Sequence, residues 1–366
     1  MTQVTAVLLG HVGADTAIVP ALFWPPGVAD GVFCCKDATM PDDVPTHAAH
    51  LMDGIQKGPI RTGWHWLGYN FTPGSAGFVT VGGATVLALA QVDALMPGFA
   101  EEQVTRLEAM GGAEKNIDHY AQIVSWYAEL LVNLKLAEHR WPAPAAFLME
   151  PTAGDSNFNP EVVVELDGVG SLGVEVKAPN LLEHSKTRST NPWQLTGRTE
   201  IGPAVLEGAV TLPRDNPVKD FLVHANKKFA GFRAADPDFR SILVIVWDDF
   251  VNEPVTALLS SSSGLLTTSS FHRENGKPVG YPNVDAILLV RHQHQIVRAL
   301  GGEALVDDRS HLLDFGRQDG FPPHALVTNP VGKQIPAAFL ACLGAVPIEV
   351  LSSAAEYNPG ELVIWQ

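Results

Sequence analysis

The chain has 366 residues, of which 46% are hydrophobic and 17% are charged, and its formal net charge is −16. This composition is that of an ordinary globular protein, long enough for two or three domains or for one large elaborated domain. Three cysteines do not make a disulfide framework, no apolar run is long enough to cross a bilayer, and the acidic balance disfavours nucleic acid as a partner.

Residues 1–112 are predicted to form a separate N-terminal α+β region, whose role the sequence does not indicate. The chain starts without the basic leading segment of a signal peptide, so the cytoplasm is the expected compartment. Gly111-Gly112 is the expected boundary. The predicted elements are short strands at 4–9, 17–24 and 31–35, a helix at 46–56, and two strands within 77–89 joined by a turn at Gly82-Gly83.

The segment 116–140 has the clearest helical periodicity in the chain. Asn116 or Asp118 is placed to cap it, and Trp141-Pro142 ends it. A short strand is expected at 145–149. The apolar residues that recur three and four positions apart are Ile117, Tyr120, Val124, Tyr127, Leu131 and Leu134.

The main candidate functional residues lie in a predicted β-hairpin at residues 159–179. Two runs rich in Val and Leu are separated by Asp-Gly-Val-Gly, which is a composition typical of turns between antiparallel strands. Successive side chains of a strand point to opposite faces, so Glu175 and Lys177 share one face. The hairpin can bring Glu161, which opens the partner strand, close to Glu175. Two carboxylates and an amine on one surface suit a hard divalent cation such as Mg²⁺.

These residues resemble the signature of the PD-(D/E)XK, or restriction-endonuclease-like, nuclease superfamily. Pro160-Glu161 is followed after thirteen residues by Glu175-Val176-Lys177, and the ending Glu-Val-Lys-Ala-Pro is typical of that family. The resemblance implies a core of order α-β-β-β-α-β with a mixed central sheet, here at residues 113–300. The first acid of the family is usually Asp, so Glu161 is a departure.

The resemblance also implies roles for these residues. Glu161 and Glu175 would bind Mg²⁺, or Mn²⁺ in its place, together with the Val176 carbonyl, and Lys177 would orient the attacking water and stabilise charge. Asp155 is an alternative first acid, and Glu150 is a less favoured one. Such nucleases often carry a helix Glu near the metal, for which the candidates are Glu129 and Glu138.

Basic residues are concentrated after the hairpin, although the chain as a whole is acidic. Residues 177–240 contain ten Lys and Arg against seven Asp and Glu, whereas residues 1–110 contain four against ten. The basic residues of this segment that are candidates for phosphate contact fall in two groups. They are Lys186, Arg188 and Arg198 in a long polar loop, and Lys219, Lys227 and Lys228 on a predicted helix at 217–232. The acidic remainder either limits non-specific DNA binding or docks a basic partner subunit.

The rest of the chain completes the core and adds an appendage. Apolar runs at 241–247 and 282–290 predict central strands. The second runs into His292 and His294, which alternation would place on one face as structural histidines. Residues 301–366 are predicted to be a C-terminal packing extension with one helix at 335–343.

Together these features predict an α/β protein and a Mg²⁺-dependent endonuclease of restriction or defence type, with DNA as its expected substrate. The alternative is a nuclease fold without catalysis that serves as a binding or assembly module and docks a partner subunit. No membrane association is expected. The sequence leaves the oligomeric state, the choice between DNA and RNA, and any sequence specificity open.

Overall fold

The computed structural model describes residues 43–111, 115–153, 158–182, 184, 191, 193–198, 212–317 and 320–364. The chain divides into two compact units, Met1–Pro41 and Asp42–Gln366, and the described residues all belong to the second. The three strands predicted before residue 36 therefore lie outside the described residues. The boundary predicted at Gly111-Gly112 lies inside the second unit.

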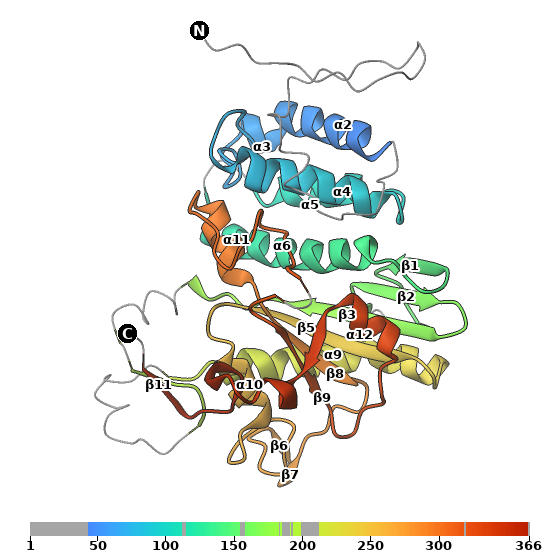
Figure 1. Cartoon of the computed structure of the whole chain (residues 1–366), viewed down its shortest axis with the longest axis vertical. Helices are drawn as coiled ribbons and strands as arrows, with labels where there is room; N and C mark the ends of the chain where they lie inside the picture. Colours follow the sequence, from blue (N-terminus) through green and yellow to red (C-terminus); the bar gives the residue numbers. More distant parts are fainter. Residues whose placement is uncertain are drawn as a thin grey trace. The chain divides into compact units, whose positions relative to one another are not determined.

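The second unit is built on a mixed seven-stranded sheet of order β1-β2-β3-β5-β8-β9-β10 (Figure 1). β1, β2 and β3 are antiparallel neighbours, and β3, β5 and β8 run parallel. β9 is antiparallel to β8 and parallel to β10. The strands are β1 (Ala145–Met149), β2 (Val162–Leu166), β3 (Gly170–Lys177), β5 (Arg240–Trp247), β8 (Ala286–Arg291), β9 (His324–Thr328) and β10 (Ala345–Pro347).

This sheet confirms the predicted α/β class with a mixed central sheet, and it extends beyond the expected end of the core. β9 and β10 come from residues after 300, where only a packing extension was expected. The described order α6, β1, β2, β3, α9, β5 agrees with the predicted α-β-β-β-α-β series, apart from the short strand β4 between β3 and α9. The remaining strands form two small sheets. One consists of β4 (Trp193–Leu195) and β11 (Leu362–Ile364), and the other of β6 (Arg273–Glu274) and β7 (Lys277–Pro278).

Local sequence explains the β2–β3 hairpin. Gly168 and Gly170 have φ of 70° and 122°, a region that favours glycine over residues with a Cβ atom, so the turn needs glycine at both positions. Val162 pairs with Val174, and both are fully buried. β5 is buried along nearly its whole length, as expected for a strand covered on both faces.

Helices cover both faces of the sheet. α6 (Ile117–Glu138) begins at Asn116, whose side chain accepts a hydrogen bond from the Asp118 amide, and it packs against β3. α9 (Asp215–Ala235) packs against β3 and β5 on the other side of the sheet (Figure 1). Its buried residues Val218, Leu222, Ala225 and Phe229 form one core with the side chains of Leu243, Ile245 and Trp247.

The remaining helices come before and after α6 in the sequence. α4 packs against α6 and α2, and α11 packs against α6. The helix predicted at 335–343 is present as α12. The bounds are α2 (Val44–Lys57), α3 (Pro59–Thr62), α4 (Ala84–Asp93), α5 (Phe99–Ala109), α10 (Asn252–Leu259), α11 (Gln293–Leu300), α12 (Ala337–Cys342), the π-helix η1 (Phe78–Gly83), and the 3₁₀ turns η2 (Ile348–Leu351) and η3 (Ala355–Tyr357).

The strand pair predicted within residues 77–89 is wrong, because this segment forms η1 and α4. Every residue of α4 except Gln91 and Asp93 is buried, so the segment shows no polar face that would mark it as a helix. Gly82 lies inside η1 rather than in a hairpin turn, and a Cβ atom there would approach the Asn70 carbonyl oxygen to 2.7 Å. Glycine is needed for close packing at this point.

None of the helices in the described part of the chain combines the length and the apolar character needed to cross a membrane.

Candidate functional site

The β2–β3 hairpin places Glu161, Glu175 and Lys177 together. Because Val162 is opposite Val174 in the antiparallel register, Glu161 is next to Glu175 on the same face. The Lys177 Nζ atom lies 2.6 Å from Glu175 Oε1 and 3.9 Å from Glu161 Oε1. One local element therefore supplies two carboxylates and an ammonium group at hydrogen-bonding or ion-pairing distance.

Lys228 joins this group from α9. Its Nζ atom lies 2.8 Å from Glu175 Oε1 and 3.6 Å from Glu161 Oε1, and it donates a hydrogen bond of 2.9 Å to Glu175 Oε2. The position follows from the helix, since Lys228 is adjacent to the buried stripe that contains Ala225 and Phe229. Lys228 was predicted to contact phosphate from the helix surface, and the structure places it beside the two carboxylates.

The Glu175 carboxylate is the most deeply buried member of the group. Its side chain is 0% exposed, while those of Lys177 and Lys228 are 22% and 21% exposed. An isolated carboxylate in such a place costs several kcal/mol, and the two ammonium groups offset that cost. The Glu175 Oε1 atom has no well-directed hydrogen bond within the described residues, but the Lys177 and Lys228 ammonium groups lie 2.6 and 2.8 Å from it.

Burial and mutual repulsion shift the titration of this group. Loss of solvent, followed by the nearby Glu175 carboxylate, raises the pKa of Glu161. Burial alone would lower the pKa of Lys177, but the Glu175 and Glu161 carboxylates outweigh it and raise that pKa. Glu161 and Lys177 therefore retain their protons more strongly than exposed side chains of the same types.

Glu129 approaches the same group from α6. Burial raises its pKa to about 8, and the Glu161 carboxylate adds to the shift, while Arg106 opposes it. The Arg106 guanidinium lies 3.7 Å from Glu129 and 3.2 Å from Glu150, so it links the two carboxylates. A polar groove of about 360 Å³ opens beside Glu129, and its walls include Arg106, Gln122, Ser125, Ala178 and Asn180.

The other candidate acids are elsewhere. Glu138, the alternative helix acid, is near Lys135, Asp314 and Gln91, and burial raises its pKa to about 7. Asp155, the alternative first acid, lies outside the described residues. Of the two helix candidates, Glu129 is the one whose pKa is raised by the Glu161 and Glu175 carboxylates, in addition to burial.

The four predicted phosphate-binding residues that the structure describes are not gathered at one place. Arg198 pairs with Asp215 at the start of α9 and lies over the Phe271 ring at 4.1 Å. Lys219 pairs with Asp220 at 3.1 Å. Lys219 and Lys228 are nine residues apart on α9, which at a rise of about 1.5 Å per residue separates them by about 14 Å along the helix axis. Lys227 is exposed. Lys186 and Arg188 lie outside the described residues.

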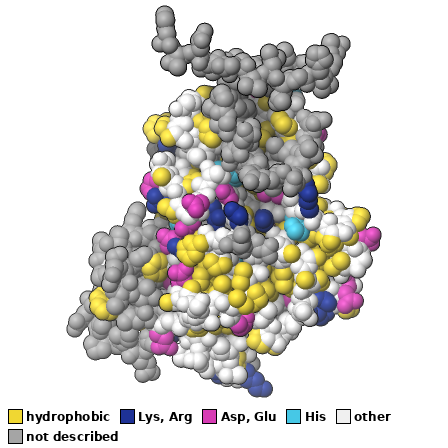
Figure 2. Space-filling model, viewed as in Figure 1, with side chains coloured by type: hydrophobic (Ala, Val, Ile, Leu, Met, Phe, Trp, Pro, Cys, Tyr) yellow, Lys and Arg dark blue, Asp and Glu magenta, His cyan; other side chains and the backbone are white. Residues whose placement is uncertain are grey.

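Basic side chains are unevenly distributed on the surface. Figure 2 shows Lys and Arg gathered in a short row across one face at the level of α6, above a broad apolar area. The row is a local concentration of basic side chains on a protein whose net charge is −16, although Asp and Glu side chains lie beside one end of it. A negative total charge therefore does not preclude a local surface for a polyanion.

His292 and His294 do not share a strand face as expected, because β8 ends at Arg291 and α11 begins at Gln293. The His292 ring is fully buried, with Nε2 2.7 Å from the Leu312 carbonyl oxygen, and burial lowers its pKa to about 3. This agrees with a structural role for His292. His294 lines a cavity at the end of the sheet.

The chemistry of the donor set fits a hard cation. Glu161 and Glu175 offer carboxylate oxygens, the ligands that Mg²⁺ prefers, and Mg²⁺ in proteins commonly uses one or two carboxylates with water completing its shell. Among the described residues, no group of three or more His, Cys, Asp or Glu side chains is arranged to hold a metal ion. Binding through Glu161 and Glu175 would require both the Lys177 and the Lys228 ammonium groups to move away from Glu175 Oε1, from which they lie 2.6 and 2.8 Å.

No family model matches the chain, and no curated protein or solved structure matches it. The function proposed below is therefore argued from the chemistry of the site.

Proposed function

We propose that this protein is a metal-dependent nuclease that hydrolyses phosphodiester bonds, with DNA as the expected substrate. The observation that carries the proposal is the placement of Glu161, Glu175 and Lys177 on one face of the β2–β3 hairpin, with Lys177 Nζ 2.6 Å from Glu175. Glu129 from α6 adds a further carboxyl group whose pKa is raised by burial and by Glu161. Buried carboxylates with shifted pKa values beside amines are typical of catalytic sites.

The residues have distinct roles in this proposal. Glu161, Glu175 and the Val176 carbonyl would hold Mg²⁺, which would supply a Lewis acid and an activated water. Lys177 orients the attacking water and stabilises the negative charge that develops on the phosphate. Lys228 pairs with Glu175 in the free protein and would contact a phosphate oxygen of a bound substrate if Mg²⁺ were present. Burial raises the pKa of Glu129 to about 8, so its carboxyl group holds a proton at neutral pH and would release it if a cation bound nearby.

The direct test is cleavage of single- and double-stranded DNA with Mg²⁺, with Mn²⁺ and with excess chelator. Activity is expected with either of the first two cations, and Ca²⁺ is expected to bind with little turnover. Lys177→Ala should lower the rate by roughly 10²–10³-fold, the usual cost of removing a group that stabilises transition-state charge. Full cleavage in chelator would exclude a metal-dependent mechanism.

Matched controls separate catalysis from folding. Lys277→Ala removes an exposed lysine on β7, and Glu165→Gln removes an exposed carboxylate on β2, the strand that Glu161 precedes. Both variants should retain activity, whereas Glu161→Gln should lose most of it with little change in melting temperature. If Asp155→Asn is inactive and Glu161→Gln is not, the first acid comes from the loop before β2.

The second candidate is a non-catalytic module that docks a partner subunit. It is favoured by the two ammonium groups that already lie 2.6 and 2.8 Å from Glu175 Oε1, since they neutralise the carboxylates without a cation. In this case Mn²⁺ should leave the melting temperature unchanged, and no DNA or RNA should be cleaved. A rise in melting temperature with Mn²⁺ would argue against this second function.

A further inference from the structure

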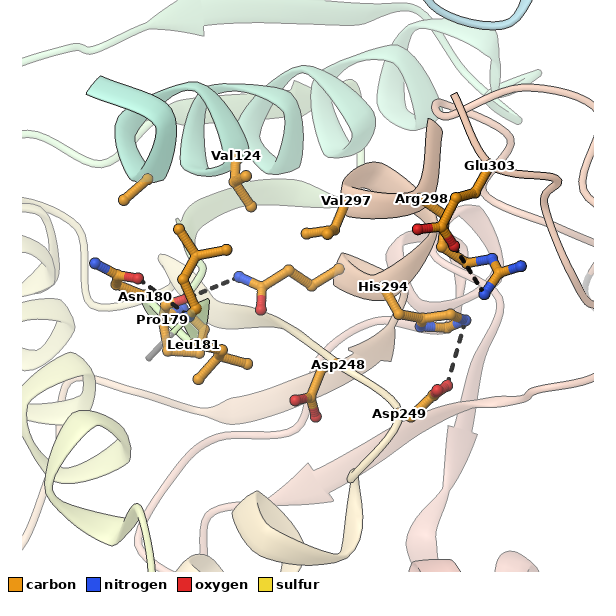
Figure 3. Close-up of a pocket in the computed structure, with 13 residues that line it drawn as sticks. Val124, Pro179, Asn180, Leu181, Asp248, Asp249, His294, Val297, Arg298 and Glu303 are labelled. Atoms are coloured by element: carbon orange, nitrogen blue, oxygen red, sulfur yellow. Dashed lines mark hydrogen bonds and ion pairs between the residues drawn. The ribbon is translucent and has the colours of Figure 1, made fainter. Parts of the chain in front are cut away.

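The polar groups at the carboxyl ends of the parallel strands are already paired with one another. Asp249 lies 3.1 Å from Arg291 and 3.4 Å from His294 (Figure 3). Asp248 accepts a hydrogen bond of 2.8 Å from the Phe250 amide. In the described part of the chain, the unmet bonding capacity of the sheet lies instead along its edge, at β1.

The two edge strands of the sheet, β1 and β10, differ in how they are protected from other strands. Proteins commonly protect an edge strand by making it short, by charged side chains or by proline. β10 has three residues and ends at Pro347, so it is protected in this way. β1 has five residues, Ala-Ala-Phe-Leu-Met, with neither a charged residue nor a proline.

No other described strand covers the outer side of β1, which pairs with β2 alone. The residues from Trp141 to Met149 include no charged side chain, and none of them is buried. Leu148 is 42% exposed. Within the described residues, β1 therefore presents an apolar edge without a partner strand.

The backbone of β1 is oriented by its hydrogen bonds to β2. The Glu150 amide donates a hydrogen bond of 3.0 Å to the Glu161 carbonyl oxygen. At the other end of the strand, the Asp167 amide donates one of 3.0 Å to the Pro144 carbonyl oxygen. Successive residues of an antiparallel strand alternate in facing a given neighbour, so the even-numbered residues of β1 face β2. The N–H and C=O groups that point to the outer side therefore belong to Ala145, Phe147 and Met149.

We propose that β1 pairs with the β1 strand of a second copy of this chain, in antiparallel orientation, about a two-fold axis that passes between the two Phe147 residues. Phe147 then lies opposite Phe147 of the partner subunit, and Ala145 lies opposite Met149 of the partner subunit. In this register each outward N–H group of one copy meets an outward C=O group of the other. The two seven-stranded sheets become one continuous sheet.

The side chains favour this register. Ala146 lies opposite Leu148 of the partner subunit on one face of the sheet, and Ala145 lies opposite Met149 of the partner subunit on the other. A small side chain thus meets a large one in each pair, and apolar cross-strand pairs stabilise neighbouring strands. An edge strand of another protein that carries charged residues would bury those charges against an apolar strand, which is unfavourable. An isologous contact, in which the same uncharged residues of both copies meet, avoids this cost.

The pairing leaves the candidate functional site free. β1 and β2 of each copy lie between the two β3 strands. The β3 strands are therefore about 24 Å apart across the sheet, at about 4.8 Å per strand spacing. A two-fold axis perpendicular to the sheet keeps Glu175 of both copies on the same face. The proposal holds whether or not the protein is a nuclease.

The contact is short, and both copies are acidic. A pairing of five residues is at the small end of protein interfaces, so we expect a dissociation constant on the order of 10 µM. Each chain carries a net charge of −16, which opposes association at low ionic strength. The dissociation constant should therefore fall as salt is added, because salt screens the repulsion.

The test is sedimentation equilibrium of the full chain. Between about 1 and 100 µM, the mass of wild type should rise from that of one chain, 39.2 kDa, towards twice that value. Leu148→Lys introduces a charge into the pairing, and Ala145→Pro removes an outward N–H group at the first residue of the strand, where proline is tolerated. Each variant should raise the dissociation constant at least about tenfold, with the melting temperature of dilute protein unchanged. Val331→Lys, at a position that is 61% exposed, is the matched control and should dimerise like wild type.

A cross-link tests the register. Residues 146 and 148 of the two copies form a pair without backbone hydrogen bonds, whose Cα atoms are about 4.5 Å apart, within the range of a disulfide. The double variant Ala146→Cys/Leu148→Cys should form a covalent dimer in oxidised glutathione. Each single variant should give no more of this species than wild type does.

Three results would overturn the proposal. A wild type that stays monomeric at the highest concentration leaves the β1 edge to a different partner. A dimer that neither Leu148→Lys nor Ala145→Pro weakens forms through another surface. A dimer in which the double cysteine variant does not cross-link pairs in another register.

Discussion

Replacing Lys228 with alanine should weaken the fold and strengthen cation binding at the same time. In the free protein, Lys228 Nζ contacts both Glu175 oxygens at 2.8 and 2.9 Å, and Glu175 is fully buried. Lys177 stays within 2.6 Å of the same carboxylate, so the charge would not be left wholly unpaired. One buried charge-assisted hydrogen bond is lost, which costs roughly 1.5–3 kcal/mol.

The two effects can be measured separately. A loss of this size should lower the melting temperature by roughly 2–4 °C for a chain of this length. Because the ammonium group that competes for Glu175 is gone, the affinity for Ca²⁺, read by calorimetric titration, should rise by about tenfold, equivalent to about 1.4 kcal/mol. DNA cleavage in Mg²⁺ should fall, since Lys228 no longer contacts the phosphate.

Lys277→Ala is the control, because this lysine is exposed on β7 and its loss should change none of the three measurements. A lower melting temperature with unchanged Ca²⁺ affinity would mean that Lys228 only stabilises the fold and that no cation competes with it for Glu175. An unchanged melting temperature would mean that the contact between Lys228 and Glu175 contributes nothing measurable.

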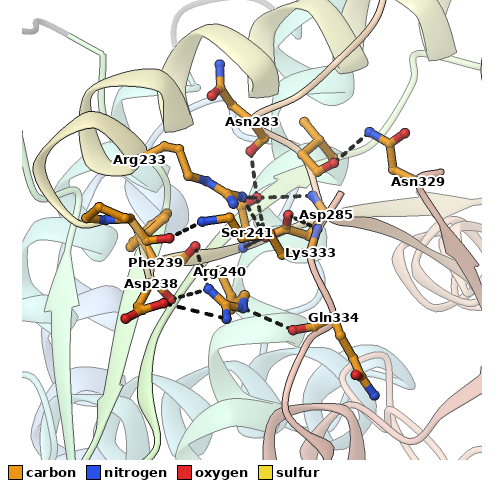
Figure 4. Close-up of polar contacts among 12 residues, drawn as sticks. Arg233, Asp238, Phe239, Arg240, Ser241, Asn283, Asp285, Asn329, Lys333 and Gln334 are labelled. Atoms are coloured by element: carbon orange, nitrogen blue, oxygen red, sulfur yellow. Dashed lines mark hydrogen bonds and ion pairs between the residues drawn. The ribbon is translucent and has the colours of Figure 1, made fainter. Parts of the chain in front are cut away.

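The remaining predictions concern stability. The buried Asp285 carboxylate accepts two backbone amide hydrogen bonds and pairs with Arg233 at 2.6 Å (Figure 4), so Asp285→Ala should destabilise the protein by about 3–5 kcal/mol in denaturant unfolding. A Cβ atom at Gly173 would approach the Phe239 ring to 2.4 Å, and Gly173→Ala should therefore cost about 1–3 kcal/mol by the same measurement. Because the pKa of Glu129 is raised from 4.5 to about 8, its contribution to stability is complete below about pH 4.5 and is lost as the pH rises through 8. The stability of Glu129→Gln relative to wild type should therefore increase between pH 5 and 8, and no change with pH would refute the shifted pKa.

The sequence predicted those parts of the fold that depend on local patterns. The period of two along β3 predicts that Glu175 and Lys177 share a face, and the turn glycines Gly168 and Gly170 predict the hairpin. The apolar run of β5 predicts a strand covered on both faces, and this strand is buried as expected. Each of these inferences uses residues that are close together in the chain.

The errors arise where long-range packing decides the structure. α4 is buried almost all round, so nothing in its own sequence distinguishes it from a buried strand. Arg106 reaches Glu129 and Glu150 from another helix, and no sequence pattern marks it. Lys228 was recognised as basic, but its contact with Glu175 depends on how α9 packs on the sheet. Tertiary placement of this kind is absent from single-sequence patterns.

The energetic character of the Glu175 site argues for a function rather than for a structural ion pair. Val174 and Val176 already provide the apolar contacts of β3, and both are almost completely buried. An apolar residue at position 175 would avoid the desolvation of a carboxylate, and replacing buried ion pairs by apolar residues is often neutral or stabilising. The chain instead keeps a buried carboxylate there with two lysines, one of them on a different element, and with the raised pKa of Glu161 beside it. Buried charge that the fold does not need is expected where it can interact with a ligand of opposite charge, and a hard divalent cation is the ligand that these oxygens suit.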